Sequence, residues 1–213
     1  EVMGAGKTNT GEPEKNNITQ GSIFGQLLLF FFPILFGTFF QQLYNTADAM
    51  VVGHFVGKQA LAAVGGTTST LINLLVGFFV GLSSGATVVI SQYYGARKPD
   101  KVHWAVHTAV AFSLMGGVLF MVIGIVFAHM ALSAMHTPED VLNYAVVYIR
   151  IYFLGMIPNL IYNMGAGILR AVGDSKRPLY FLIGSCMVNI LLDIILVAGL
   201  RMGVAGAAIA TIT

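Results

Sequence analysis

The sequence predicts an all-α fold in which a bundle of helices crosses a membrane several times. Hydrophobic residues make up 56% of the 213 residues and charged residues only 9%, whereas soluble domains average about 25% charged residues. Apolar segments of at least the ~20 residues that a transmembrane helix needs follow one another along the chain. Glycine is frequent, with 25 residues, as it is in membrane helices that pack closely.

Five apolar segments are long enough to cross a bilayer, and a sixth is incomplete. We predict spans at about 23–55, 61–94, 102–132, 141–171 and 179–200, followed by an incomplete span at 203–213. We expect residues 1–20, which are polar and rich in Gly, Asn and Thr, to form a disordered cytoplasmic tail before a transmembrane part at 21–213. Because the sixth segment is cut short, we expect the chain to be a fragment of a longer protein.

Two features within these segments predict how the helices bend and pack. Pro33 lacks a backbone N–H group, so we expect it to bend the first helix. Gly77, Gly81 and Gly85 recur every four residues on one face of the second helix. Such a ridge of small residues predicts a seam against a neighbouring helix.

The distribution of Lys and Arg predicts the orientation of the helices, because short cytoplasmic loops carry an excess of both. They concentrate in the tail and in the loops after the second and fourth segments (Lys7, Lys15; Arg97, Lys98, Lys101; Arg170, Lys176, Arg177). We therefore expect a multi-pass protein of the cell membrane (plasma or inner) with a cytoplasmic N-terminus. The net charge of +2 is too small to indicate a nucleic-acid partner.

Only two of the nine acidic residues, Asp48 and Asp193, lie inside predicted spans. An ionised Asp at the centre of a membrane helix costs roughly 2.5–3.5 kcal/mol. A residue that costs this much is functional by default, and it requires a partner. Both acids are therefore candidate site residues.

Other polar residues accompany each acid. Gln41, Tyr44 and Asn45 precede Asp48 at spacings that place all four on one helix face, and Asn189 lies one turn before Asp193. Carboxylate and amide oxygens are ligands for hard cations, and burial favours the protonated form of a carboxyl group. The pattern predicts a site for H⁺ or Na⁺. The alternative is that these groups only join helices, through hydrogen bonds of about 0.6 kcal/mol each.

Other kinds of site find little support in the sequence. His103 and His107 are spaced like a pair of zinc ligands, but no third ligand lies nearby. Cys186 is the only cysteine, so no disulfide framework is possible. No nucleophile-and-base pattern is present. We predict that the protein is not an enzyme, has no metal site beyond a possible Na⁺ at the acids, and needs no cofactor other than a coupling ion.

Several motifs follow one another in order along the chain. They are QQLYNTAD at 41–48, ALAAVG at 60–65, SQYYGA at 91–96, LRAVGD at 169–174 and GVAGAAIAT at 203–211. Together with Pro33, Asn189 and Asp193 they resemble the N-terminal half of the multidrug and toxic compound extrusion (MATE) transporters. The resemblance covers about 21–213.

This resemblance implies a fold and a function. MATE transporters have twelve helices in two lobes around a cavity, and they export amphipathic, often cationic compounds against an inward H⁺ or Na⁺ gradient. The family's cation site corresponds here to Asp48, Asn189, Asp193 and Thr211, and its bending proline corresponds to Pro33. The implied partners are small drug-like substrates, the lipid bilayer and a C-terminal lobe that is missing here.

Two alternatives remain open. A lipid-linked saccharide flippase of the same wider superfamily should carry basic residues inside the membrane to meet phosphate, and the deep parts of the predicted spans hold none. A membrane scaffold or channel subunit without coupled transport would lack ion-dependent substrate counterflow in vesicles. That measurement separates it from a transporter.

Overall fold

The computed structural model describes residues 23–213, and within them every regular element is helical. The elements are α1 (Ile23–Phe55), α2 (Lys58–Gly65), α3 (Thr67–Gly95), α4 (Pro99–Ala134), α5 (Glu139–Leu154), α6 (Met156–Ala171), α7 (Lys176–Asp193), the π-helix η1 (Ile194–Gly199) and α8 (Gly203–Ile212). The predicted tail at 1–20 lies outside the described residues.

Among the described residues, four helical segments are long and apolar enough to cross a membrane, and there are five if a bent pair of helices counts as one span. The four are Leu27–Phe55, Lys58–Gly95, Pro99–Ala134 and Lys176–Gly199, and the pair is α5 with α6. Large apolar side chains cover their outer faces; Leu74 and Trp104, for example, are 70% and 73% exposed. A surface this apolar suits lipid. The predicted fold class, an all-α membrane bundle, is confirmed.

The second and fourth predicted segments are each broken into two helices, which the sequence analysis did not foresee. Gly66 separates α2 from α3, and a Cβ atom there would collide with the carbonyl oxygen of Ala62, so only glycine fits. The α5–α6 pair bends by 53° at Gly155. Pro158, in the first turn of α6, has no N–H group to continue the hydrogen bonding of α5.

Pro33 does not interrupt α1, which continues as one helix from Ile23 to Phe55. A proline removes one backbone donor, but the hydrogen bonds before and after it hold the helix together. The bend expected at Pro33 therefore does not break α1 into two helices in this structure.

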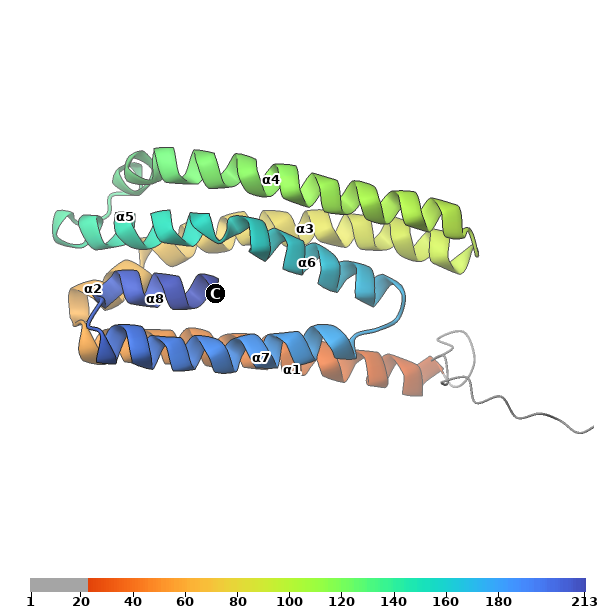
Figure 1. Ribbon diagram of the computed structural model, residues 1–213, viewed down its shortest axis with the longest axis horizontal. Helices are drawn as coiled ribbons and strands as arrows, with labels where there is room; N and C mark the ends of the chain where they lie inside the picture. The colour runs from red at the N-terminus through yellow and green to blue at the C-terminus, as the bar shows by residue number, and fades with distance from the viewer. Residues whose placement is uncertain (1–22) are drawn as a thin grey trace, which may run out of the picture.

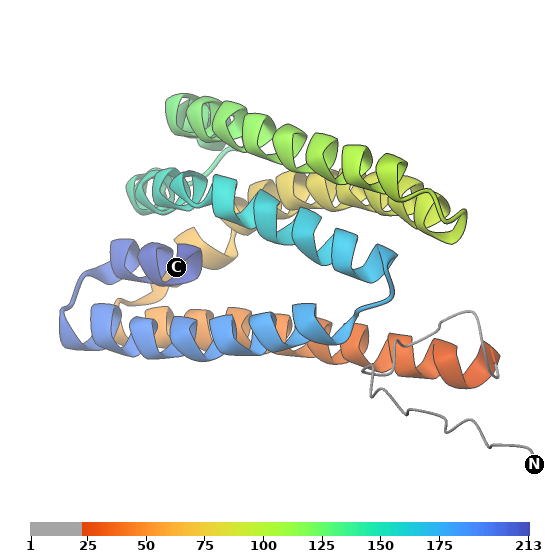
Figure 2. The same cartoon turned by 45° about the vertical axis from the view of Figure 1, so that its right-hand side comes forward.

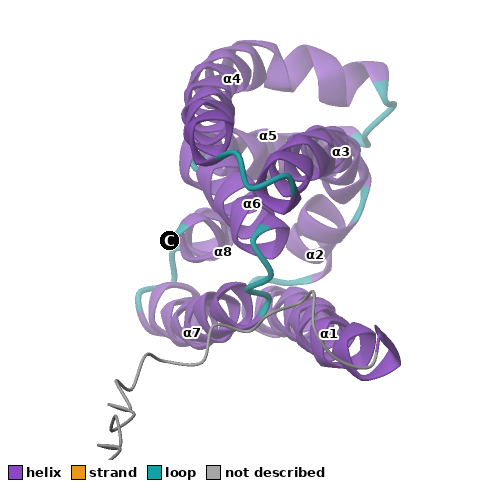
Figure 3. Cartoon of the chain, turned by 90° about the vertical axis from the view of Figure 1, so that its right-hand side faces the viewer, coloured by secondary structure: helices purple, strands orange, loops and turns teal. Residues whose placement is uncertain are grey.

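The helices form a layered bundle. α1 and α7 lie side by side along one side (Figures 1 and 2), and α4 lies on the opposite side. α2 and α8 occupy the middle, next to α3, α5 and α6 (Figure 3). One core cluster, around Phe79, Ile149 and Phe153, includes residues of α3, α4, α5 and α6. Another, around Val52 and Tyr148, includes residues of α1, α5 and α8. The α3–α4 and α6–α7 loops lie at the same end as the start of α1 (Figure 1).

The closest helix approaches use glycines other than the predicted ridge. A Cβ atom at Gly124 would run into the ring of Phe153, and one at Gly117 would lie 3.0 Å from the Cα atom of Ile157. These glycines let α4 pack tightly on α5 and α6. Cβ atoms at Gly77, Gly81 and Gly85 would meet nothing within 4 Å. The predicted seam at these three is therefore wrong within the described part of the chain.

Candidate cation-binding site

The structure brings the four predicted cation-site residues together. Asp48 comes from α1, Asn189 and Asp193 from α7, and Thr211 from α8. They meet because α1 packs along α7, and α8 follows η1 back into the bundle (Figure 1). Asp48 is 4%, Asn189 7% and Asp193 0% exposed. Charged groups buried this deeply need compensation from polar partners.

Each carboxylate oxygen of Asp48 accepts one hydrogen bond. The side-chain amide of Asn189 donates to Oδ1 over 3.3 Å, and the hydroxyl of Thr211 lies 3.1 Å from Oδ2. The Thr211 hydroxyl also lies 2.9 Å from the backbone oxygen of Ala207, one turn earlier in α8. Asp48 therefore ties α1 to both α7 and α8.

Asp193 is arranged differently. Neither of its carboxylate oxygens accepts a hydrogen bond from a described residue, and the same holds for Oδ1 of Asn189. The carboxyl groups of Asp193 and Asp48 are close neighbours. Two adjacent buried carboxyl groups cannot both stay ionised without a positive charge between them. The arrangement can therefore hold a proton or a small cation such as Na⁺.

The helix geometry changes directly after Asp193. The backbone continues as the π-helix η1, and the amide of Leu200 donates to the carbonyl of Ile195, five residues earlier, over 2.8 Å. Such wide turns are rare and occur frequently at functional sites. No pattern in the sequence predicted this one, because a π-turn depends on packing more than on residue type.

Tyr148 on α5 is a further neighbour of the site that the sequence analysis missed. It is 4% exposed, and its hydroxyl lies close to Thr211 and Asp48. Its ring stacks with that of Tyr152, one turn on, with ring centroids 6.5 Å apart. The sequence signal was this pair of tyrosines at i and i+4 in an apolar helix.

The predicted polar stripe on α1 divides in the structure. Tyr44 is half-buried and lies beside Gln41 and near Asp48. Asn45 is exposed, and its amide donates to Oε1 of Gln42 over 3.3 Å. Pro33 precedes Asp48 by fifteen residues, which is about 22 Å along a helix. Pro33 is therefore outside the site.

The remaining candidate groups lie elsewhere. The rings of His103 and His107 are 4.2 Å apart on α4, but no cluster of three or more His, Cys, Asp or Glu side chains suited to a metal occurs among the described residues. The buried Cys186 thiol lies 3.8 Å from the backbone oxygen of Phe40, so it packs α7 against α1.

The sequence matches the profile of the MatE family over residues 33–195. A curated relative, the "Probable multidrug resistance protein YoeA" of Bacillus subtilis (strain 168), is 35% identical over 195 residues, which cover 90% of this chain and 42% of the relative. The chain thus spans less than half the length of the relatives it matches.

Solved structures give the same result. A structure described as the outward-facing conformation of a multidrug resistance MATE family transporter has a TM-score of 0.83 and 28% identity, covering 90% of this chain and 42% of that one. The corresponding inward-facing structure has a TM-score of 0.74 and 29% identity, covering 81% and 39%. The chain therefore belongs to the MatE family of multidrug and toxic compound extrusion transporters, and it corresponds to the N-terminal half of such a protein.

Proposed function

We propose that the protein to which this chain belongs exports amphipathic, often cationic compounds across the cell membrane in exchange for inward-moving H⁺ or Na⁺. The relatives are named as multidrug resistance proteins, which supports this substrate class. The proposal rests on the buried pair of Asp48 and Asp193. The buried polar atoms at this pair that have no hydrogen-bond partner among the described residues are all acceptor oxygens, from Asp193 and Asn189. Unpaired buried acceptors require a positive charge or a hydrogen-bond donor.

The two acids have different roles in this proposal. Asp48 has donors from Asn189 and Thr211, which hold its carboxylate in the arrangement seen here. Both oxygens of Asp193 and Oδ1 of Asn189 have no donor among the described residues. An incoming H⁺ or Na⁺ is therefore held chiefly between Asp193 and Asp48, with Asn189 and Thr211 as additional oxygen ligands.

Occupation of the site favours one arrangement of α1 relative to α7 and α8. When the cation leaves, two adjacent carboxylates repel each other across the α1–α7 contact, and an arrangement that separates them gains stability. A bend of α1 at Pro33 is one way to separate them. The exchange is then a population shift, driven by the different cation affinities of the two arrangements.

We place the end of the bundle that carries the α3–α4 and α6–α7 loops on the cytoplasmic side. Six basic residues lie in or beside these loops (Arg97, Lys98, Lys101, Arg170, Lys176, Arg177), and the loops share one end with the start of α1 (Figure 1). Excess Lys and Arg in short loops favours the cytoplasmic side. The N-terminus is then cytoplasmic.

Efflux by the full-length protein tests this function. Cells loaded with a fluorescent cationic dye should lose it faster when they express the wild type, and Asp48→Asn should abolish this gain. Asp140→Asn, which removes an exposed acid at the start of α5, is the matched control and should export normally. Wild-type efflux by Asp48→Asn would refute the coupling role, and a wild type without ion-dependent counterflow would favour the scaffold alternative.

A further inference from the structure

A groove between α3, α4 and α6 is separate from the candidate cation-binding site. Its volume is about 660 Å³, and its lining is mostly apolar. This volume lies within the ~300–1,000 Å³ typical of sites for small ligands. None of the four cation-site residues lines it. The groove is therefore a second candidate binding surface.

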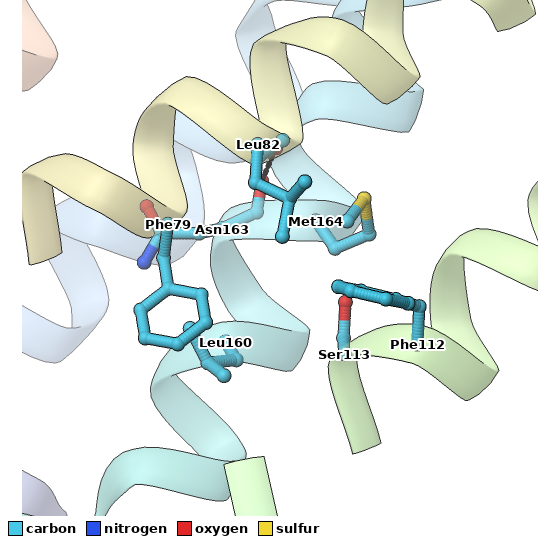
Figure 4. Close-up of a pocket in the computed structure, with 8 residues that line it drawn as sticks. Phe79, Leu82, Phe112, Ser113, Leu160, Asn163 and Met164 are labelled. Atoms are coloured by element: carbon cyan, nitrogen blue, oxygen red, sulfur yellow. Dashed lines mark hydrogen bonds between the residues drawn. The ribbon is translucent and has the colours of Figure 1, made fainter. Parts of the chain in front are cut away.

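The two ends of the groove differ in chemistry. At one end, Nζ of Lys101 lies 5.7 Å from the ring centroid of Tyr93, and the exposed Trp104 lines the wall one turn farther along α4. At the other end, Leu82, Phe112 and Met164 come from three different helices and surround a void of about 10 Å³ (Figure 4). A ligand with a polar head and an apolar tail matches this arrangement.

The length of the groove matches one leaflet of a bilayer. Lys101 and Phe112 are eleven positions apart in the sequence, which is about 16 Å along a helix. The hydrocarbon core of a bilayer is about 30 Å thick, so one leaflet contributes about 15 Å. The groove is therefore long enough to hold an acyl chain that reaches across one leaflet.

Positively charged side chains at the polar end of the groove favour a ligand with a negatively charged head. Arg97, Lys98 and Lys101 lie close together in the sequence with one acid, Asp100. Within the part of the chain that the structure describes, the ion pair between Arg177 and Asp174 is the only one, so these three basic side chains have no carboxylate partner there. The N-terminus of α4 has no side-chain cap and adds a partial positive charge. A cationic ligand would be repelled from this end.

We propose that the groove between Lys101 and Phe112 binds one acyl chain of an anionic phospholipid, with the lipid phosphate held by Lys98 and Lys101. Tyr93 and Trp104 lie where aromatic side chains commonly meet the headgroup region. Basic pockets between transmembrane helices on the cytoplasmic side are suited to such headgroups. This lipid site does not depend on how the cation-binding site is coupled to transport.

Native mass spectrometry of the full-length protein in detergent tests the headgroup preference. We expect the wild type to retain phosphatidylglycerol in preference to phosphatidylcholine with the same acyl chains. Lys101→Ala should weaken retention of phosphatidylglycerol about fivefold, as the loss of one basic residue near an anionic headgroup predicts. Lys176→Ala removes the same charge from the other basic loop and should retain phosphatidylglycerol like the wild type.

A second pair of variants tests the groove itself. Gly85 lines the groove, and a Cβ atom there would meet nothing within 4 Å, so Gly85→Phe should fill the groove without disturbing the fold and should lose both lipids. Gly81 also has open space around it but does not line the groove, so Gly81→Phe is the control and should retain them. Glycerol 3-phosphate, which lacks acyl chains, should not compete.

Five results would overturn the proposal. The wild type could retain the two lipids equally, Lys101→Ala or Gly85→Phe could each retain them like the wild type, or glycerol 3-phosphate could compete effectively. The fifth is a wild type that retains neither lipid, which is the outcome if another part of the full-length protein covers the groove.

Discussion

The hydroxyl of Thr211 on α8 lies 3.1 Å from Oδ2 of Asp48 on α1, although the two residues are 163 positions apart. The same hydroxyl lies 2.9 Å from the backbone oxygen of Ala207. A hydroxyl carries a single hydrogen, so it can donate fully to only one of these oxygens at a time. Thr211 can therefore stabilise Asp48 when the site is empty, and turn to Ala207 while its oxygen faces a bound cation.

Removing this hydroxyl should impair coupling. Thr211→Val keeps the branched shape but removes a hydrogen bond to a charged group, which is worth about 1.5–3 kcal/mol. We expect the driving ion concentration for half-maximal efflux to shift at least tenfold, measured from initial rates of dye efflux. Thr211→Ser restores the hydroxyl and should recover most of the wild-type behaviour. An ion dependence unchanged in Thr211→Val would remove Thr211 from the site.

Sequence reasoning found the long apolar helices and the acids buried among them because both depend on local composition. A long run of apolar residues predicts a membrane helix whatever that helix packs against. An acid such as Asp193 within the run stands out because burying its charge in a membrane costs free energy. Thr211 was different, since a single Thr in an apolar segment is unremarkable and only the family resemblance indicated it.

The features that sequence reasoning missed depend on contacts between helices. Gly77, Gly81 and Gly85 have the spacing of a packing ridge, yet the close approaches occur at Gly117 and Gly124. Glycine spacing is equally compatible with an exposed face and a packed one. Similarly, the breaks in the second and fourth segments depend on local geometry that an apolar run does not reveal.

The contact between Gly124 and Phe153 should be sensitive to added volume. Any side chain at Gly124 would run into the Phe153 ring, and overpacking a core costs about 1–3 kcal/mol. Gly124→Leu should therefore lower the thermal unfolding midpoint in detergent. Gly81→Leu adds the same side chain where nothing lies within 4 Å and should leave the midpoint unchanged. Equal midpoints for the two variants would contradict this packing.

The α6–α7 loop depends on Asp174. Its Oδ1 accepts hydrogen bonds from the amides of Lys176 and Arg177, each over 3.1 Å, and its Oδ2 lies 3.0 Å from Nε of Arg177. This is capping of the α7 N-terminus, which is worth about 0.5–2 kcal/mol. Asp174→Ala should lower the thermal unfolding midpoint, whereas Asp174→Asn should retain most of it. A midpoint unaffected by Asp174→Ala would show that the cap adds nothing.

The proposed orientation can be tested by labelling single cysteines in intact cells. In a Cys186→Ala background, a cysteine at Lys58 should react with a thiol reagent that cannot cross the membrane, because the α1–α2 loop would face outward. A cysteine at Lys98, at the opposite end of the bundle (Figure 1), should react only after the cells are opened. The reverse pattern would invert the topology.

If Asp48 and Asp193 hold one cation between them, the purified full-length protein should bind that cation directly. Binding of radioactive Na⁺ and uptake of protons by a pH-indicator dye should be measured in parallel, so that either ion is detected. We expect cation binding by the wild type and Asp140→Asn, and none at this site in Asp48→Asn or Asp193→Asn. Wild-type binding by Asp193→Asn would contradict it.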